Sequence, residues 1–327
     1  MIITRTPLRI SFVGGGSDLR EYYSKNTGAV VSTAIDKYIY VMVNSRPDKQ
    51  IRLAYSESEY VKEASLLKHN IIRECLKLLG FKTGIDITYS GDLPIDRVGT
   101  GLGASSSLAV GVLHALHEFK GEKVYHDQLA EEACRVEIEM LEHPIGKQDQ
   151  YIAAFGGVNL IRFNKDDRVE VLPILMQENL RNSLENNLLL FYTGLASDSV
   201  SVLTEQKNKT QDNFAVLASM VGFTDKVSEM LVNGELNEFG KTLHQNWLYK
   251  KQLASKVSNE LIDEYYKKGL ASGAEGGKIL GSGGGGFLLF YCKPEKQDSL
   301  RKALSDLDEL KFKFSPTGSQ VIYESAQ

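Results

Sequence analysis

The sequence predicts an α+β protein of two domains. Hydrophobic residues make up 42% of its 327 residues, which is enough to fill two cores of ordinary size. Short runs of β-branched and aromatic residues dominate the first third, and helical and strand patterns are mixed after it. Because neither half shows the regular alternation of strand and helix that builds a doubly wound sheet, we expect an α+β rather than an α/β architecture.

The expected strands are short runs rich in β-branched or aromatic residues. They cover residues 2–4, 9–13, 29–34, 38–44, 51–54, 85–90, 157–163, 169–173, 188–193, 286–292, 311–315 and 320–323. The expected helices carry apolar residues at a spacing of three to four. They cover residues 105–118, 127–142, 199–221, 226–233, 236–254, 259–271 and 295–307. The chain turns polar and rich in Asn between 166 and 187, so we expect one domain over residues 1–175 and another over residues 176–327.

Charge and cysteine usage argue against several classes of partner. The 38 Lys and Arg residues and 42 Asp and Glu residues are scattered and give a formal charge of -4, so we expect no nucleic-acid partner. Cys75, Cys134 and Cys292 lie far apart among apolar neighbours, as reduced core cysteines do. The N-terminus lacks the apolar core of a signal peptide, and no apolar run reaches membrane-spanning length. We therefore expect a cytoplasmic protein without a membrane partner.

The strongest local signal is the segment Gly99-Thr-Gly-Leu-Gly-Ala-Ser-Ser-Ser107, which leads into the expected helix over residues 105–118. Three alternate glycines free the backbone to curl, and the serines are expected to cap the helix. A helix N-terminus carries partial positive charge and unpaired N–H donors, which suit a polyphosphate. An ordinary capped loop is the alternative, but the glycine density and the serine run favour anion binding.

Two better-known phosphate loops do not fit this segment. A P-loop needs a Lys directly after its last glycine, and no Lys follows here. The Rossmann fingerprint places its glycines directly after a strand, whereas residues 91–97 separate this loop from the expected strand 85–90. Dinucleotide binding is therefore the weaker interpretation.

Glu137 falls in the apolar stripe of the expected helix over residues 127–142. A carboxylate that faces a core is costly unless a cation or hydrogen bonds compensate it. A bound metal ion would satisfy it, and a structural salt bridge would do so equally well.

Asp149 lies 12 residues after Glu137, between a Pro and Gly break and a second apolar run. It is a candidate for a return to the same pocket, although capping a helix is the commoner role of an Asp after a loop. Two carboxylates near a phosphate loop are what phosphoryl transfer requires. One holds Mg²⁺ and the other orients or deprotonates the acceptor hydroxyl.

Two more glycine-rich segments complete the pattern. Pro7-Leu-Arg-Ile-Ser-Phe-Val-Gly-Gly-Gly-Ser-Asp18 runs from a strand into a turn that ends in an acid, and Gly281-Ser-Gly-Gly-Gly-Gly-Phe287 precedes a strand. In this order and at these separations, the three loops resemble the three motifs of the GHMP kinases over essentially the whole chain. Within that superfamily, the first loop, Phe191-Tyr-Thr-Gly194 and residues 273–287 are most similar to the D-glycero-D-manno-heptose 7-phosphate kinases, which phosphorylate the anomeric hydroxyl of their sugar phosphate.

The resemblance implies a fold and a set of roles. The N-terminal domain would be of the ribosomal-protein-S5 domain-2 type, the C-terminal domain ferredoxin-like, and the active site would lie between them. Asp149 matches the family's catalytic Asp, Arg9 the Arg beside it, and Ser105 with Glu137 the Mg²⁺ ligands. Nucleotide contacts are implied for Gly99, Gly101, Leu102, Gly103, Ala104, Ser105 and Ser106. Contacts with the sugar are implied or expected for Gly15, Gly16, Ser17, Asp18, Arg20, Lys250, Gly283, Gly284 and Gly285.

The function that follows is an ATP-dependent sugar kinase, with GTP as a possible donor and Mg²⁺ as cofactor. Its acceptor would be the C1 hydroxyl of D-glycero-D-manno-heptose 7-phosphate, phosphorylated by direct in-line transfer. Two alternatives stay open, namely a kinase for an unphosphorylated sugar of the fucose or galactose type and a non-catalytic sugar sensor on the same fold. The partners would be a small sugar or sugar phosphate and a nucleotide, and nothing in the sequence indicates an oligomeric state.

Overall fold

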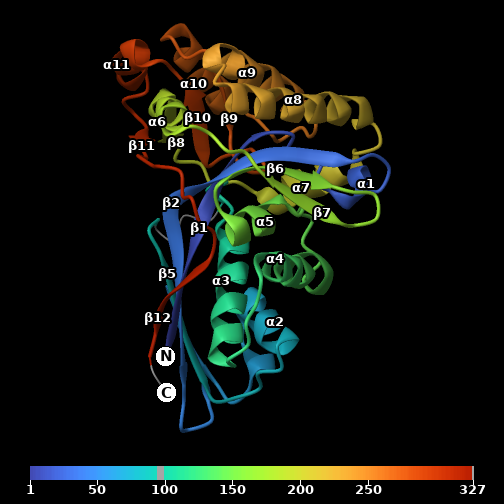
Figure 1. Ribbon diagram of the computed structural model, residues 1–327, viewed down its shortest axis with the longest axis vertical. Helices are drawn as coiled ribbons and strands as arrows, with labels where there is room; N and C mark the ends of the chain where they lie inside the picture. The colour runs from blue at the N-terminus through green and yellow to red at the C-terminus, as the bar shows by residue number, and fades with distance from the viewer. Residues whose placement is uncertain (94–98, 326–327) are drawn as a thin grey trace.

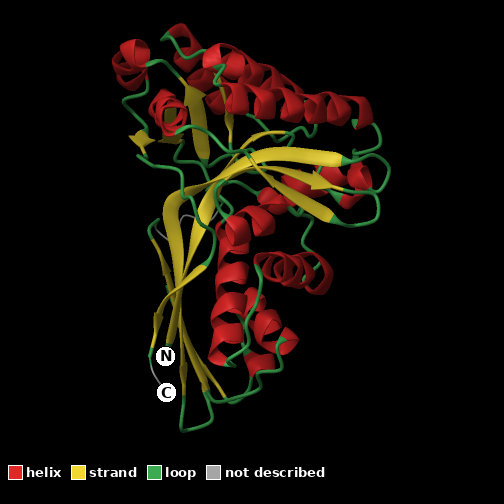
Figure 2. Cartoon of the chain, in the orientation of Figure 1, coloured by secondary structure: helices red, strands yellow, loops and turns green. Residues whose placement is uncertain are grey.

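The computed structural model describes residues 1–93 and 99–325 and consists of two sheets with their helices (Figure 1). The elements mix without a regular alternation of strand and helix, so the predicted α+β class is confirmed (Figure 2). None of the helices in the described ranges combines the length and the apolar character that a membrane span requires.

The larger sheet has the strand order β12-β1-β2-β5-β3-β4, with β6 paired to β2 and β7 paired to β6. Its strands are β1 (Ile2–Val13), β2 (Gly28–Ser45), β3 (Ile51–Ala54), β4 (Ser58–Val61), β5 (Ile85–Gly91), β6 (Val158–Phe163), β7 (Val169–Pro173) and β12 (Gln320–Glu324). All pairs are antiparallel except β3 with β5. The long strand β2 pairs with β6 through its first half and with β5 through its second half, so it joins both parts of the sheet.

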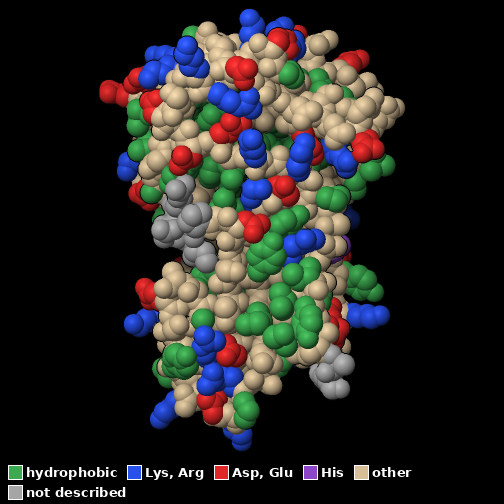
Figure 3. Space-filling view, turned by 90° about the vertical axis from the view of Figure 1, so that its left-hand side faces the viewer, with side chains coloured by type: hydrophobic (Ala, Val, Ile, Leu, Met, Phe, Trp, Pro, Cys, Tyr) green, Lys and Arg blue, Asp and Glu red, His purple; other side chains and the backbone are tan. Residues whose placement is uncertain are grey.

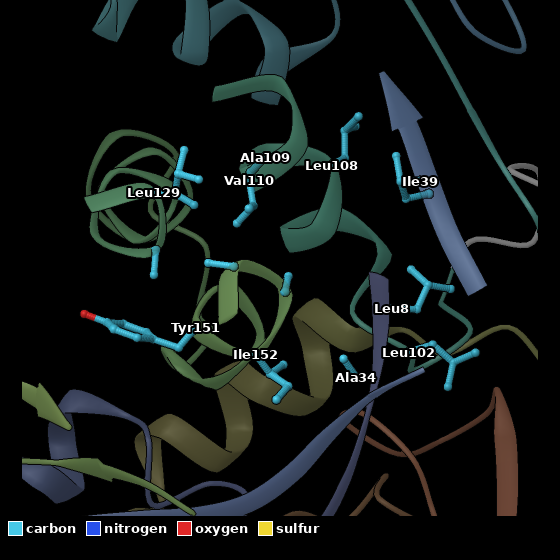
Figure 4. Packing of buried hydrophobic residues seen from close by; sticks show 14 of the residues in the cluster. Leu8, Ala34, Ile39, Leu102, Leu108, Ala109, Val110, Leu129, Tyr151 and Ile152 are labelled. Atoms are coloured by element: carbon cyan, nitrogen blue, oxygen red, sulfur yellow. The ribbon is translucent and has the colours of Figure 1, made fainter. Parts of the chain in front are cut away.

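Helices cover one face of this sheet (Figure 1). They are α2 (Asn70–Leu78), α3 (Ala104–Phe119), α4 (His126–Cys134) and α5 (Gln148–Phe155). Helix α3 is buried along most of its length because it lies between the sheet and the other helices, with Leu108 on the side of Ile39 in β2 and Val110 on the side of Leu129 in α4 (Figure 4). The start of α3, which follows the glycine loop, thereby packs against β1.

On the other face, α8 (Phe214–Asn233) and α9 (Phe239–Lys250) pack on the upper part of β1, β2 and β6. No helix of the described residues covers the lower half of that face, and Figure 3 shows hydrophobic side chains gathered there. Tyr38 and Tyr40 lie two positions apart on β2, so their side chains share one face of the strand, and their ring centroids are 6.2 Å apart. The guanidinium of Arg5 lies 4.6 Å from the centroid of the Tyr38 ring. Amphipathic side chains of this kind allow an antiparallel sheet to face water on one side.

The second sheet is smaller and has the strand order β11-β8-β10-β9, all antiparallel. Its strands are β8 (Leu188–Tyr192), β9 (Gly276–Ile279), β10 (Phe287–Tyr291) and β11 (Asp308–Glu309). Around it lie α6 (Glu178–Asn187), α7 (Ser199–Asn208), α8 (Phe214–Asn233), α9 (Phe239–Lys250), α10 (Glu260–Ala271) and α11 (Pro294–Ala303), and α1 (Arg20–Tyr23) follows β1. Fully buried Trp247 and Phe290 anchor its core.

The chain crosses from the larger to the smaller sheet after β7 and returns at its end, where β12 pairs with β1. The proposed boundary at residue 175 falls between β7 and α6, and residues 320–324 belong to the larger sheet. The division into two domains at that residue stays a prediction.

Several elements differ from the sequence prediction. Helices α2, α5 and α6 and strands β4, β9 and β11 had no counterpart in it, the expected strands over 29–34 and 38–44 are the single strand β2, and the expected helix over 226–233 is the end of α8. The two expected strands over 2–4 and 9–13 are one strand, because Pro7 is accommodated where the register with β2 shifts. The expected helix over 199–221 is broken between α7 and α8 by the polar residues 209–213, where Thr210 Oγ1 donates to Gln206 O at 3.0 Å and Asn213 Nδ2 donates to Leu253 O at 3.0 Å. Residues 311–315 form only an isolated bridge, between Phe314 and Ile35, because carboxylates take two of their N–H groups: Lys313 N donates to Asp36 Oδ1 at 2.8 Å and Phe314 N to Glu185 Oε1 at 2.9 Å.

Candidate active site

A cavity of about 650 Å³ lies between the larger sheet with its helices and the segments α7, α9 and 281–282. It brings together most of the residues that the sequence singled out. Those that line it are Arg9, Gly15, Gly16, Asp18, Gly99, Gly101, Gly103, Ala104, Ser105, Ser106, Glu137, Asp149 and Lys250. These residues span more than two thirds of the chain, so the fold, and not sequence proximity, assembles the site.

The glycine loop needs glycine at two positions in particular. Gly101 and Gly103 have φ of 76° and 75°, a left-handed conformation that side chains rarely adopt. A Cβ on Gly101 would also lie 2.6 Å from Leu280 O, and one on Gly103 would lie 3.3 Å from Asp149 Oδ2. The loop is therefore pressed between the second glycine segment and Asp149.

The serines after this loop do not cap the helix as predicted. Gly103 is the N-cap residue, and the first turn of α3 has no side-chain cap. Ser105 Oγ donates instead to Glu137 Oε1, and Ser107 Oγ donates to Pro7 O at 2.8 Å. Because these side chains bind elsewhere, they do not cap the N–H groups of the first turn, and such uncapped groups suit an anion.

Glu137 is fully buried on a π-helical turn, Arg135–Met140, that continues α4. Ser105 Oγ donates to Oε1 and Gln150 Nε2 donates to Oε2 at 2.6 Å. Burial raises the pKa of Glu137, and the hydrogen bonds from Ser105, Ser106 and Gln150 oppose that shift. The apolar stripe of the sequence thus correctly indicated a carboxylate that faces inward.

The pair of Ser105 and Glu137 fits a magnesium ion. Mg²⁺ prefers oxygen ligands and takes one or two protein groups together with waters and substrate phosphates. A hydroxyl and a carboxylate that already touch beside a glycine loop supply such a set. Among the described residues no group of three or more His, Cys, Asp or Glu side chains could hold a metal, so a site made of protein ligands alone is absent from that part of the chain.

Asp149 stands on the first turn of α5 and is gripped by Arg9 of β1. Arg9 Nε donates to Oδ1 at 2.7 Å and Arg9 Nη2 to Oδ2 at 2.6 Å, which is a bidentate ion pair. Arg9 Nη1 donates to Gly101 O at 2.5 Å, so the same guanidinium ties the carboxylate to the glycine loop. Only 5% of the Arg9 side chain is exposed, and this burial fixes the direction of the Asp149 carboxylate.

Asp18 and its neighbours form the next wall of the cavity. Asp18 accepts hydrogen bonds from Gly16 N at 2.8 Å and Gln148 N at 3.3 Å, while burial, aided by Asp149, raises its pKa. Ser17 Oγ donates to Gly14 O at 2.8 Å, so this hydroxyl holds the turn and does not line the cavity.

Some predicted residues lie outside the cavity wall. Leu102 is a core residue beside Leu8 (Figure 4), and its carbonyl accepts from Arg9 N at 3.0 Å. Arg20 is exposed and pairs with Asp167 at 3.3 Å. In the second glycine segment, Gly281 and Ser282 line the cavity, whereas Gly283, Gly284 and Gly285 pack against residues 195–202 and 256–257.

Several polar residues of the cavity were assigned no role from the sequence, although Ser11 and Lys278 lie within segments that carry the family resemblance. Ser11 Oγ and Gln148 Oε1 line it and are buried without a hydrogen-bond partner in the described structure. Lys278 of β9 is 1% exposed and donates to Ser11 O at 2.8 Å and Phe12 O at 3.1 Å. Only the even spacing of Arg9 and Ser11 on one strand face could have indicated any of these residues.

Lys250 is the last residue of α9 and lines the cavity from the side of the smaller sheet. Its ammonium donates to Gly281 O. Burial lowers the pKa of Lys250 to about 7, and Arg9 shifts it in the same direction.

Comparison with known proteins assigns both parts of the chain to one family. Residues 61–157 match the family described as GHMP kinases N terminal domain, and residues 228–309 match the one described as GHMP kinases C terminal. The D-glycero-alpha-D-manno-heptose 7-phosphate kinase of Campylobacter jejuni is 32% identical over 321 residues, which cover 93% of this chain and 93% of that protein. The galactokinase of Pyrococcus furiosus is 25% identical over 358 residues, which cover 96% and 95%.

The fold has counterparts among solved structures. A D-glycero-D-manno-heptose 1-phosphate kinase from Bacteroides thetaiotaomicron superposes with a TM-score of 0.83 over 100% of both chains, at 24% identity. A sugar kinase described as putative, from Campylobacter jejuni, superposes with a TM-score of 0.73 over 98% of this chain and 97% of that one, at 26% identity. The arrangement of both sheets is therefore shared with these proteins.

Proposed function

The chain belongs to the GHMP kinase family as an ATP-dependent sugar kinase, and we propose that it phosphorylates the anomeric C1 hydroxyl of D-glycero-D-manno-heptose 7-phosphate to give the 1,7-bisphosphate. The observation that carries the proposal is the Asp149 carboxylate, held by Arg9 beside the glycine loop and close to Asp18. The 32% identity to the Campylobacter heptose 7-phosphate kinase supports the choice of acceptor.

The transfer is a single in-line displacement. Asp149 accepts the proton of the C1 hydroxyl while that oxygen bonds to the γ-phosphorus, and the bond from phosphorus to the β-phosphate oxygen breaks to release ADP. Arg9 keeps the Asp149 carboxylate aimed at the acceptor, and the N–H groups at the start of α3 hold the phosphates. Magnesium bound by Ser105 and Glu137 would neutralise phosphate charge.

The remaining proposed contacts divide between the two substrates. The nucleotide side takes Gly99, Gly101, Leu102, Gly103, Ala104, Ser105 and Ser106, of which Leu102 contributes backbone only. The sugar side takes Gly15, Gly16 and Asp18, and the segment that carries Gly283, Gly284 and Gly285 lies behind Gly281 and Ser282. Ser17 is left out because its hydroxyl donates to Gly14 O and does not line the cavity. Ser11 and Gln148 are added here because their buried, unpartnered oxygens face the cavity. Arg20 is left out because its side chain is exposed and paired with Asp167.

One observation favours a second candidate, a kinase for an unphosphorylated sugar. In the described structure, the Arg and Lys side chains that line the cavity are Arg9, Lys250 and Lys278, and all three interact with one another near Asp149. A phosphate at the far end of the sugar would need its own cationic partner. The galactokinase relative makes such an acceptor a direct rival.

A panel of acceptors tests the two candidates. ADP release would be measured with ATP, Mg²⁺ and each of heptose 7-phosphate, the unphosphorylated heptose, galactose and fucose, with no added sugar as control. The proposal expects kcat/KM for heptose 7-phosphate to exceed that for every unphosphorylated sugar by roughly 10²-fold or more, since a desolvated phosphate with good partners is worth several kcal/mol. Higher activity with an unphosphorylated sugar would transfer the assignment to the second candidate.

A further inference from the structure

Lys250 keeps two N–H donors without a protein acceptor in the described structure, as many as Arg9 keeps of its five and more than Lys278 keeps of its three. Arg9 donates three hydrogen bonds and Lys278 donates two, whereas Lys250 donates one, to Gly281 O. An ammonium group has three N–H donors. Two donors of Lys250 are therefore left for a ligand in the cavity that it lines.

The surroundings of Lys250 make an anion the natural ligand. The charged groups that face it are Arg9 and Lys278, which repel its charge, and Asp18 and Asp149, which attract it. No carboxylate in the described structure lies within ion-pairing distance of its ammonium, and only 6% of the residue is exposed. A buried cation without a counter-ion is stabilised most when an anion enters.

The position of Lys250 identifies which anion this is. Its acceptor, Gly281, is pressed against the phosphate loop, since a Cβ on Gly101 would lie 3.2 Å from Gly281 N. Asp149 flanks the same loop at Gly103. Lys250 and the catalytic carboxylate thus both reach the place where the loop would present the terminal phosphate.

We propose that Lys250 is a catalytic residue whose ammonium contacts the phosphoryl group while it passes from the nucleotide to the sugar hydroxyl. The inference rests on the proposed kinase function and adds to it a charged group from the smaller sheet's side of the cavity. Lys250 forms and breaks no covalent bond. Its positive charge stabilises the negative charge that develops on the oxygens of the transferring phosphoryl group. The side chain takes up a proton from solvent when the triphosphate binds.

The competing explanation is that Lys250 only ties α9 to the second glycine segment. Two variants separate the explanations, Lys250→Met, which keeps the apolar stem, and Lys250→Arg, which keeps the charge. Lys251→Met is the matched control, because Lys251 follows directly in sequence but pairs with Asp263 at 3.3 Å and does not line the cavity. Melting temperature and circular dichroism confirm that each variant is folded.

The first readout is steady-state kinetics with the best acceptor of the panel. Lys250→Met should lower kcat by roughly 10²–10³-fold, the loss seen when one donor to a developing oxyanion is removed, with a smaller change in the KM for ATP. Lys250→Arg should recover at least part of this loss, and Lys251→Met should match the wild type. Equal kcat in Lys250→Met and wild type would overturn the proposal.

The second readout needs no turnover. Binding of a non-hydrolysable ATP analogue with Mg²⁺ would be measured by titration calorimetry at pH 8 in two buffers of different ionisation enthalpy. Because burial lowers the pKa of Lys250 to about 7, the wild type and Lys251→Met should take up a fraction of a proton, and Lys250→Met should take up less. Proton uptake that is the same in all three proteins would contradict the contact, even if no acceptor of the panel is phosphorylated.

Discussion

Ser105 and Glu137, 32 positions apart in the chain, are joined by a hydrogen bond from the serine hydroxyl to Oε1 of the carboxylate. Ser105 lies on the first turn of α3, and Glu137 lies on the π-helical turn that continues α4. Such turns insert a residue into a helix and recur at functional sites. The pair places a fully buried carboxylate beside the loop that we assign to the nucleotide phosphates.

Glu137→Gln should stabilise the protein while it weakens metal binding. Because burial raises the pKa of Glu137, the folded protein favours its neutral form, and the charge costs stability once the pH is above the pKa in the folded state. The variant should therefore melt at a higher temperature than the wild type at pH 7.5 without Mg²⁺. Its kcat should fall by roughly 10²-fold or more, since a metal at the phosphates is worth several kcal/mol.

Differential scanning calorimetry and an ADP-release assay over a Mg²⁺ series measure both effects. Glu139→Gln is the matched control, because Glu139 lies on the same turn but is exposed. A Glu137→Gln enzyme with normal turnover and an unchanged Mg²⁺ dependence would refute the assigned role.

Asp149→Asn should impair turnover and spare nucleotide binding. The amide keeps the size of the carboxylate but cannot accept the acceptor proton, and a general base contributes roughly 10²–10⁴-fold to the rate. We expect kcat to fall within that range while the Kd of an ATP analogue, measured by calorimetry, changes little. Asp225→Asn, a change in an exposed residue that pairs with Arg162, should leave both quantities unaltered. Wild-type turnover in Asp149→Asn would remove the basis for the mechanism.

Gly101→Ala should damage the phosphate loop by more than backbone strain. Gly101 and Gly121 have φ of 76° and 74°, so an Ala at either position costs about 1–2 kcal/mol in the left-handed region. A Cβ on Gly101 would in addition lie 2.6 Å from Leu280 O, whereas one on Gly121 has no atom within 4 Å. We expect kcat/KM for ATP to fall roughly 10²-fold in Gly101→Ala, since a shift of about 1 Å can cost that much, and to stay normal in Gly121→Ala. Similar kinetics in both variants would show that the loop tolerates displacement.

His117 should make stability depend on pH. Its ring bonds to Glu122 Oε2 at 3.0 Å and to Glu132 Oε2 at 2.7 Å, and these contacts, led by Glu132, raise the pKa of His117. Because the folded pKa lies above the unfolded one, the contribution is complete below the unfolded value of about 6.5 and is lost as the pH rises through the folded value. The melting temperature of His117→Gln should therefore lie below that of the wild type at pH 6, and the difference should shrink as the pH rises to 9. His126→Gln, a change in an exposed histidine, is the control. A difference that is constant over this range would contradict the assignment.

Local signals in the sequence sufficed to single out the three glycine loops and the inward-facing Glu137, whereas the role of Asp149 came from the resemblance to the GHMP kinases. Each of these local signals rests on a rule that can be applied to one segment without knowing which distant residues it contacts, such as the conformational freedom of glycine or the cost of a carboxylate in an apolar stripe. The GHMP kinase fold that these motifs indicated is confirmed by the family matches and by the superposed structures.

The rest depends on contacts between distant segments. The serines after the glycine loop were expected to cap α3, but Glu137 competes for Ser105 and Pro7 O competes for Ser107. Lys278 is an isolated basic residue in an apolar strand, and only the meeting of β9 with the end of β1 gives it two carbonyl acceptors. Nothing local to such residues distinguishes them from ordinary polar positions.

The most direct test of the account is ³¹P NMR of the protein with ATP, Mg²⁺ and heptose 7-phosphate. The account predicts that the γ-phosphate signal disappears while ADP and a new phosphate signal coupled to the anomeric proton appear at equal rates, and that Asp149→Asn slows all three changes together. Unchanged ATP, or ADP accompanied only by inorganic phosphate, would contradict it.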